Sequence, residues 1–276
     1  MAGTAPSGSN VLLTRILSAA ILAPVAIVVA YVGGWPFVLF WGAAAIAILW
    51  EWMGLVAAAR QMPVAVGAAA IVLSAPLIIL GWPLAALAVI VLGGVAAALL
   101  TPQQRRGWAA AGVVYAGLML AAPLLLRGDG LIGAEAFFLL FAIVWTTDVL
   151  GYFAGRAIGG PKLAPSISPA KTWSGAIAGI VGTAIVVALG SRLVPHARMS
   201  TLIVVAIALS VMSQLGDLLE SAFKRRFGTK DTSRLIPGHG GVMDRLDGFW
   251  AAAVCAALVG VLRGGFAAPA AGLLLW

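Results

Sequence analysis

The residues best suited to chemistry lie in one polar stretch, SAFKRRFGTKDTSRLIPGHGGVMDRLD at 221–247, near the end of a largely apolar chain. The aspartates in and just before it are Asp217, Asp231, Asp244 and Asp247. Carboxylates suit Mg²⁺, which commonly binds one or two of them together with substrate phosphates. The basic side chains able to neutralise phosphate are Lys224, Arg225, Lys230 and Arg245. This composition predicts a site for a metal ion and a phosphate-bearing substrate.

Glycines in the same stretch favour anion binding by the backbone. Gly238, Gly240 and Gly241 permit positive φ and close approach, so that successive N–H groups can surround an anion. The stretch contains no G-x-x-x-x-G-K-[ST] pattern, which excludes a P-loop.

A polar stripe precedes this stretch, in SVMSQLGDLLESAFKRR at 210–226. Its members recur at steps of three and four and therefore share one helix face; they are Ser210, Ser213, Gln214, Asp217, Glu220, Ser221 and Lys224. Such a stripe is costly against lipid, so it must face other helices or water. It either forms interhelical hydrogen bonds, with Asp217 paired to an arginine, or lines a functional site. Elsewhere, Glu51 between Trp50 and Trp52 is interpreted as an interfacial anchor.

The rest of the chain must position these residues within a membrane. Of its 276 residues 62% are hydrophobic and 9% charged, against about 25% charged in a soluble domain. Residues 16–50 and 61–104 carry no charge, whereas a spanning helix needs only about 20 apolar residues. We therefore predict an all-α, polytopic integral membrane bundle: a disordered cytosolic tail at 1–11, then one transmembrane domain at 12–276. The predicted spans are 12–32, 36–56, 63–82, 84–100, 108–126, 132–153, 173–190, 201–220 and 248–266.

The distribution of basic residues predicts the orientation. With nine spans and the N-terminus inside, 13 of the 17 Lys and Arg residues lie on the inner side, and Arg127, Arg192, Arg198 and Arg263 lie outside. The N-terminus and the polar loops 154–172 and 221–247 are then cytosolic, and the protein is integral to the cell (inner) membrane. The net charge of +8 reflects this topology and attraction to anionic lipid, so no nucleic-acid partner is expected. The sequence leaves open whether the protein forms a homodimer.

The motif resembles that of the phosphatidate cytidylyltransferase (CDP-diacylglycerol synthase) family. The family pattern is S-x-[hydrophobic]-K-R-x4-K-D-x-[small]-x2-[LIF]-[PGS]-x-H-G-G-[hydrophobic]-x-D-R-[hydrophobic]-D. It is matched without a gap by Ser221, Lys224, Arg225, Lys230, Asp231, Ser233, Ile236, Pro237, His239, Gly240, Gly241, Asp244, Arg245 and Asp247. The GDLLES run at 216–221 and the D-x-x-G-Y-x-x-G run at 148–155 extend the resemblance.

The resemblance implies that CTP and phosphatidic acid, a membrane lipid, react to give CDP-diacylglycerol and pyrophosphate. It assigns Mg²⁺ to Asp217 and Asp244, with support from Glu220 and Asp247 and room for a second cation. The residues expected to act on the phosphates are Lys224, Arg225, Lys230, Asp231 and Arg245. The residues expected to bind substrate are Ser168, Lys171, Ser221, His239, Gly240, Gly241 and Asp148. For His239 we expect phosphate contact or loop support, because a phosphatidate oxygen needs little general-base activation.

A second loop, at 158–175, departs from the family's S-P-K-K-T-x-E-G pattern. Ser168, Pro169, Lys171, Thr172 and Gly175 match, but Ala170 replaces a lysine and Ser174 replaces a glutamate. Lys162 is a candidate to supply the missing charge.

Upstream, Asp148 either pairs with a basic residue on another helix or supports the metal or cytidine site. Gly151, Gly155 and Gly159 recur every four residues, which favours close helix packing.

Two other functions remain alternatives. A transporter would use Asp148 and Asp217 to couple ions, which explains the spans but leaves the basic glycine-rich stretch without a role. A CDP-alcohol transferase or a CTP-using lipid kinase is the other, although the D-G-x2-A-R pattern of the former is absent.

Overall fold

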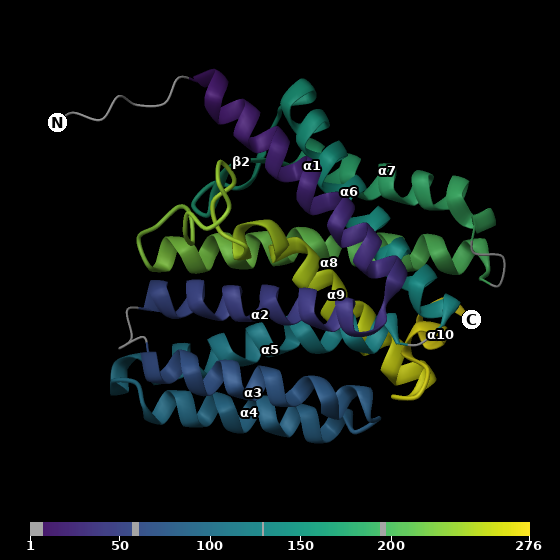
Figure 1. Ribbon diagram of the computed structural model, residues 1–276. Helices are drawn as coiled ribbons and strands as arrows, with labels where there is room; N and C mark the ends of the chain where they lie inside the picture. The colour runs from purple at the N-terminus through teal and green to yellow at the C-terminus, as the bar shows by residue number, and fades with distance from the viewer. Residues whose placement is uncertain (1–7, 57–60, 129, 194–196) are drawn as a thin grey trace.

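The computed structural model describes residues 8–56, 61–128, 130–193 and 197–276, and its described part is a helical bundle (Figure 1). The α-helices are α1 Gly8–Val32, α2 Gly34–Val56, α3 Gln61–Ile79, α4 Pro83–Leu99, α5 Arg106–Arg127, α6 Leu131–Ile158, α7 Trp173–Gly190, α8 Met199–Arg226, α9 Met243–Gly264 and α10 Pro269–Leu274. Short 3-10 turns lie at Gln103–Arg105 and Ser191–Leu193. The predicted all-α class is confirmed.

Seven helices of the described part are long and apolar enough to cross a membrane: α2, α3, α5, α6, α7, α8 and α9. Two shorter apolar segments, Ala20–Val32 in α1 and Pro83–Leu99 in α4, fall below that length. Each predicted span falls on one of the helices α1 to α9. The count of nine crossings therefore stays a prediction. Of the predicted tail, residues 1–7 lie outside the described residues and 8–11 belong to α1.

Aromatic packing joins helices that are far apart in the sequence. Trp41 of α2 stacks on Phe249 of α9 with ring centroids 4.8 Å apart. Phe137 of α6 is fully buried and meets Trp41 edge-on at 5.7 Å. Figure 1 shows α2 to α5 side by side, α8 next to α2, and α9 crossing obliquely from α8 towards α10. This core fixes the helices whose ends carry the polar residues.

Glycines bring α6 and α7 into close contact, as the sequence predicts. A Cβ on Gly175 of α7 would lie 2.6 Å from the Gly151 carbonyl oxygen and 3.2 Å from Gly155 Cα. Gly159 has a different role: it ends α6 with φ of 67°. The close approach places the start of α7, and the segment before it, against the end of α6.

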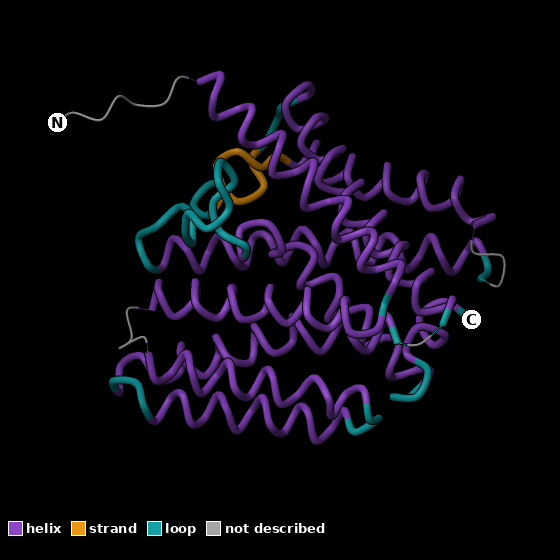
Figure 2. Tube along the Cα trace, viewed as in Figure 1, coloured by secondary structure: helices purple, strands orange, loops and turns teal. Residues whose placement is uncertain are grey.

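Both polar segments lie at one end of the bundle. Strands β1 Lys162–Ala164 and β2 Ser168–Thr172 form an antiparallel hairpin, with Lys162 opposite Thr172. Figure 2 shows this hairpin, which the sequence did not predict, beside the loop that follows α8.

The predicted polar loop 221–247 is wrong at both ends, because α8 continues to Arg226 and α9 begins at Met243. Ser221, Lys224 and Arg225 are therefore helical, and so are Asp244, Arg245 and Asp247. The three- and four-residue spacing of the stripe continues the helix, and polarity alone does not end it.

The Pro237-Gly238 pair makes the turn at the tip of the remaining loop. His239 N–H donates to the Ile236 carbonyl at 3.0 Å, and Gly238 has φ of 75°. Proline followed by glycine at positive φ is the signature of a type II turn. The turn reverses the chain, and Ile236 N–H then donates to Gly240 O at 2.8 Å.

Helix α1 contacts the rest of the protein through polar groups in its middle and near its C-terminal end. Ser18 Oγ donates to the Pro237 carbonyl at 3.1 Å. Near the C-terminus of α1, the buried Arg127 guanidinium donates to the carbonyls of Ala30 at 2.6 Å and Tyr31 at 3.0 Å. Arg127 also donates to the carbonyls of Gly128 and Gly130. One arginine thus binds the C-terminal carbonyls of α1 and the end of α5.

Candidate active site

A charged cavity of about 880 Å³ opens at the end of the bundle that carries the hairpin and the loop. Its walls come from α6, the hairpin, α7, α8 and α9. The carboxylates that line it are Asp148, Asp217, Asp231, Asp244 and Asp247. The cations that line it are Arg156, Lys162, Lys171, Lys224 and Arg245. Its volume lies in the range of ligand sites, and its lining is suited to anionic groups together with a cation.

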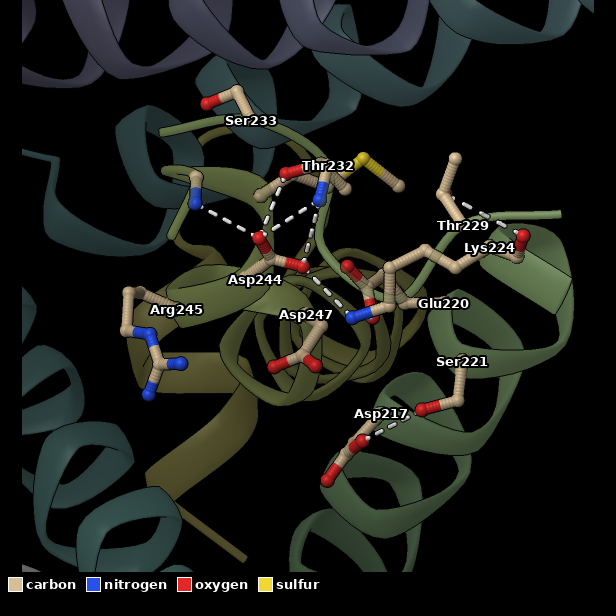
Figure 3. A network of polar contacts seen from close by, with 12 residues as sticks. Asp217, Glu220, Ser221, Lys224, Thr229, Thr232, Ser233, Asp244, Arg245 and Asp247 are labelled. Carbon is tan, nitrogen blue, oxygen red and sulfur yellow. Dashed lines mark hydrogen bonds and ion pairs between the residues drawn. The ribbon is translucent and has the colours of Figure 1, made fainter. Parts of the chain in front are cut away.

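Lys224 lies between two carboxylates. Its Nζ is 2.6 Å from Glu220 Oε2 on the same helix and 2.7 Å from Asp244 Oδ1 on α9 (Figure 3). The three side chains are 13%, 1% and 3% exposed, respectively. These ion pairs join α8 to α9 directly below the loop.

Asp244 is also bound by the loop. Its Oδ2 accepts hydrogen bonds from Gly241 N–H at 2.8 Å, Thr232 N–H at 3.0 Å and Thr232 Oγ1 at 2.9 Å (Figure 3). The carboxylate lies in the first turn of α9, where free N–H groups and the helix dipole favour negative charge. Asp244 thus holds the loop at two points as well as facing the cavity.

Asp217 pairs with a lysine of the hairpin, so the arginine partner considered from the sequence is wrong. Lys171 Nζ lies 2.5 Å from Asp217 Oδ2, and Ser221 Oγ donates to Oδ1 at 3.4 Å. Gln214, Asp217 and Lys224 of the stripe line the cavity. Deeper in the bundle, Ser210 Oγ accepts a hydrogen bond from Thr147 at 2.8 Å. The stripe therefore both lines a cavity and joins helices.

Three further aspartates line the cavity, and they differ from Asp217 and Asp244 in their partners. Within the residues that the structure describes, Asp148, Asp231 and Asp247 form no ion pair. The structural pairing considered for Asp148 is therefore absent there. Asp247 accepts a hydrogen bond from Gly248 N–H at 2.7 Å, and Figure 3 places its carboxylate between α9 and Asp217.

Some predicted site residues lie outside the main cavity. Arg225 is exposed and donates to the carbonyls of Ile167 and Thr229, which ties the hairpin to the loop. The others that do not line it are Lys230, Ser168, Ser221, Glu220 and Gly241. His239 and Gly240 line an adjoining pocket of about 350 Å³ with Asp231, Gly238 and Arg245. Arg245 Nε also donates to the His239 carbonyl at 3.0 Å.

The hairpin shows what the two departures from the family pattern do. Ala170 faces the cavity, and Lys162, which the sequence offered in compensation, faces the same cavity from the paired strand. Ser174 Oγ donates to the Gly159 carbonyl at 2.5 Å. Thr172 caps α7, since its Oγ1 accepts from Gly175 N–H. Through its bond to the Gly159 carbonyl, Ser174 joins the start of α7 to the end of α6.

Glu51 is the residue whose role the sequence missed, and its interpretation as an interfacial anchor is wrong. Its side chain is buried and accepts hydrogen bonds from the loop and from the start of α9. The available signal was an acidic residue in an otherwise apolar span, which favours a functional or structural partner by default. Tyr152 and Arg156 were missed too; they line the cavity and share a hydrogen bond of 3.1 Å.

Comparison with known proteins agrees with this geometry. A sequence profile described as "Cytidylyltransferase family" matches residues 13–262. The chain belongs to the cytidylyltransferase family. A protein of Brucella abortus named phosphatidate cytidylyltransferase is 43% identical over 259 residues, which is 93% of this chain and 94% of that protein. Proteins of the same name from Haemophilus influenzae and Staphylococcus epidermidis are 47% identical over 119 residues and 48% over 110 residues, about two fifths of each chain. The resemblance seen in the motif is confirmed.

The Lys224 ion pairs in this cytidylyltransferase predict a loss of stability as well as activity on substitution. Lys224→Met leaves Glu220 and Asp244 buried without their cation, and breaking a buried pair typically costs about 3–5 kcal/mol. We expect a lower apparent Tm in detergent. Lys230→Met is the matched control, because Lys230 is exposed and has no ion pair in the described part. Equal melting temperatures for the two variants would contradict the structural role of Lys224.

Proposed function

We propose that this cytidylyltransferase transfers the cytidylyl group of CTP to phosphatidic acid, giving CDP-diacylglycerol and pyrophosphate. The observation that carries the proposal is the cavity itself, where five cations and five carboxylates meet at one end of an apolar bundle. The name of the relatives supports the same reaction. A phosphatidate oxygen would attack the α-phosphorus of CTP, and the bond from that phosphorus to the β-phosphate oxygen would break.

The chemistry assigns the cations their task. Both substrates are anions, so charge neutralisation and positioning should dominate catalysis. Lys171, Lys224 and Arg245 come from the hairpin, α8 and α9, and all three face the cavity. Arg156 and Lys162 add positive charge on the wall formed by α6 and β1. Arg225 and Lys230 lie outside the cavity, so the geometry supports a phosphate contact less well for them than for these five cations.

We propose that Mg²⁺ supports the reaction, held by Asp217 and Asp244. Within the described residues, no three His, Cys, Asp or Glu side chains are grouped as a metal cage. Mg²⁺ needs no such cage where substrate phosphates complete its coordination, and two carboxylates that line one cavity fit this requirement. The ion would neutralise phosphate charge and release Lys171 from Asp217 to contact phosphate, while Lys224 would keep Glu220 as its partner. Asp247 is suited to support a second cation.

The reaction experiment uses purified protein with labelled CTP and phosphatidate in mixed micelles. We expect a CDP-lipid and one pyrophosphate for each CTP consumed, because the attack displaces pyrophosphate. A transporter would release no pyrophosphate, and a lipid kinase would give CDP and a phosphorylated lipid. Either of those outcomes, or consumption of CTP without phosphatidate, would exclude the proposal.

The metal proposal is tested by Asp217→Asn and Asp244→Asn. Each should lower kcat by about 10²–10³-fold, the scale of one electrostatic stabiliser. The double variant should be little worse, since residues that act as a unit are non-additive. Asp244→Asn should also lower the Tm, because the loop and Lys224 bind this carboxylate. Mg²⁺ activation curves give the decisive measurement: unchanged midpoints with additive losses would rule out a shared ion.

We also propose that the protein lies in the cell's inner membrane with both polar segments on the cytosolic side, where CTP is available. Leu235→Cys in a Cys255→Ala background should react with impermeant maleimide only after the cytosolic face is exposed, since Leu235 is 50% exposed in the loop. Leu131→Cys, at the opposite end of α6, is the matched control and should react from outside. The reverse labelling pattern would invert the topology.

A further inference from the structure

Glu51 is the first acidic residue in the chain and lies far from the motif in sequence. Its carboxylate on α2 is 1% exposed and accepts four hydrogen bonds. Oε1 accepts from Ser233 Oγ at 2.6 Å and Val242 N–H at 2.8 Å. Oε2 accepts from Met243 N–H at 2.8 Å and Thr232 Oγ1 at 3.2 Å. Every one of these donors belongs to the loop or to the start of α9.

Two of the donors are backbone groups that a helix start leaves free. Val242 precedes α9 and Met243 is its first residue, so neither N–H has a partner within the helix. Val242 supplies no side-chain cap. A carboxylate at this position satisfies both N–H groups and interacts favourably with the helix dipole. The cap of α9 therefore comes from α2, 191 positions earlier in the chain.

The loop closes tightly between Glu51 and Asp244. Thr232 Oγ1 lies 3.2 Å from Glu51 Oε2 and 2.9 Å from Asp244 Oδ2, so its hydroxyl contacts both carboxylates. A Cβ on Gly241 would lie 2.6 Å from Glu51 Oε1 and would overlap Thr232 Oγ1. Only glycine fits there without displacing one of them. The second glycine of the H-G-G motif is thus required by packing against Thr232 and Glu51.

We propose that Glu51 is a positioning residue for cytidylyl transfer. It does not line the cavity. It fixes the loop and the first turn of α9, from which Asp244 and Arg245 reach the cavity, and Asp247 follows in the next turn. The inference rests on the proposed function for its catalytic consequence, whereas the anchor itself rests on the hydrogen bonds alone.

The variant Glu51→Gln tests the anchor with little change of shape. Each carboxylate oxygen faces two donors, so an amide places its own NH₂ donor against two of them. Misplacing a group by about 1 Å can cost about 10²-fold in rate. We expect kcat per folded protein to fall by about that factor, with a smaller change in the KM for CTP. Glu135→Gln is the matched control; it removes a charge on α6 about 20 Å along the helix from Asp148.

Thr232→Val provides a second variant if Glu51→Gln folds poorly. It keeps the shape and removes only the hydroxyl between the two carboxylates, so its loss of kcat should be smaller. If Glu51, Thr232 and Asp244 act as one unit, the double variant Glu51→Gln/Thr232→Val should lose less than the product of the single losses. Multiplicative losses would contradict the proposal.

Hydrogen exchange separates positioning from stability alone. In Glu51→Gln, exchange within the amides of 241–243 should be faster than in the wild type, because either Val242 N–H or Met243 N–H then faces the NH₂ group and loses its acceptor. The amides of the hairpin at 162–172 should keep their rates, since none of them bonds to Glu51. Wild-type kcat per folded protein, or unchanged exchange at 241–243, would overturn the proposal. Faster exchange in a protein whose wild type makes no CDP-lipid would support the anchor and remove the proposed function.

Discussion

Lys224 and its two carboxylates make up the interaction on which the arrangement of the site depends. The ammonium group lies within 2.7 Å of Glu220 and Asp244, and both carboxylates are almost fully buried. Removing such charges from water is costly unless each has a close partner of opposite sign. The need for partners draws α8 and α9 together at their polar ends. It also fixes Asp244, around which the loop folds, and so the cavity wall follows from this one set of contacts.

A site built in this way balances charge before any substrate arrives. Lys171 pairs with Asp217, and Lys224 pairs with Glu220 and Asp244. Arg156, Lys162 and Arg245 line the cavity without an ion pair in the described part of the chain. Such a cavity can accept anionic groups without first breaking an ion pair, because these three side chains are free of carboxylates. The paired lysines become available only when another cation takes their place.

The sequence predicted much of the fold and part of the site, for physical reasons that differ. Long uncharged runs report helices directly, so α1 to α9 were all located. The spacing of the stripe predicted that Asp217 and Lys224 share a helix face, and both line the cavity. Charge alone does not say where a side chain points, so it could not predict that Arg225 and Lys230 lie outside the main cavity. Glu51 was missed because its partners lie more than 180 positions away, beyond the reach of any local pattern.

Two contacts of helix α1 fix the distance between the loop and the Arg127 side chain. Ser18 binds the loop at the end of the bundle that carries the cavity, and Ala30 binds Arg127 at the other end. The twelve residue steps from Ser18 to Ala30 span about 18 Å at the rise of an α-helix. One inserted residue would lengthen that interval by about 1.5 Å and rotate one contact by about 100° relative to the other. The helix therefore acts as a spacer of fixed length. Substitutions on its exposed face leave this interval unchanged, whereas an insertion or deletion between Ser18 and Ala30 does not.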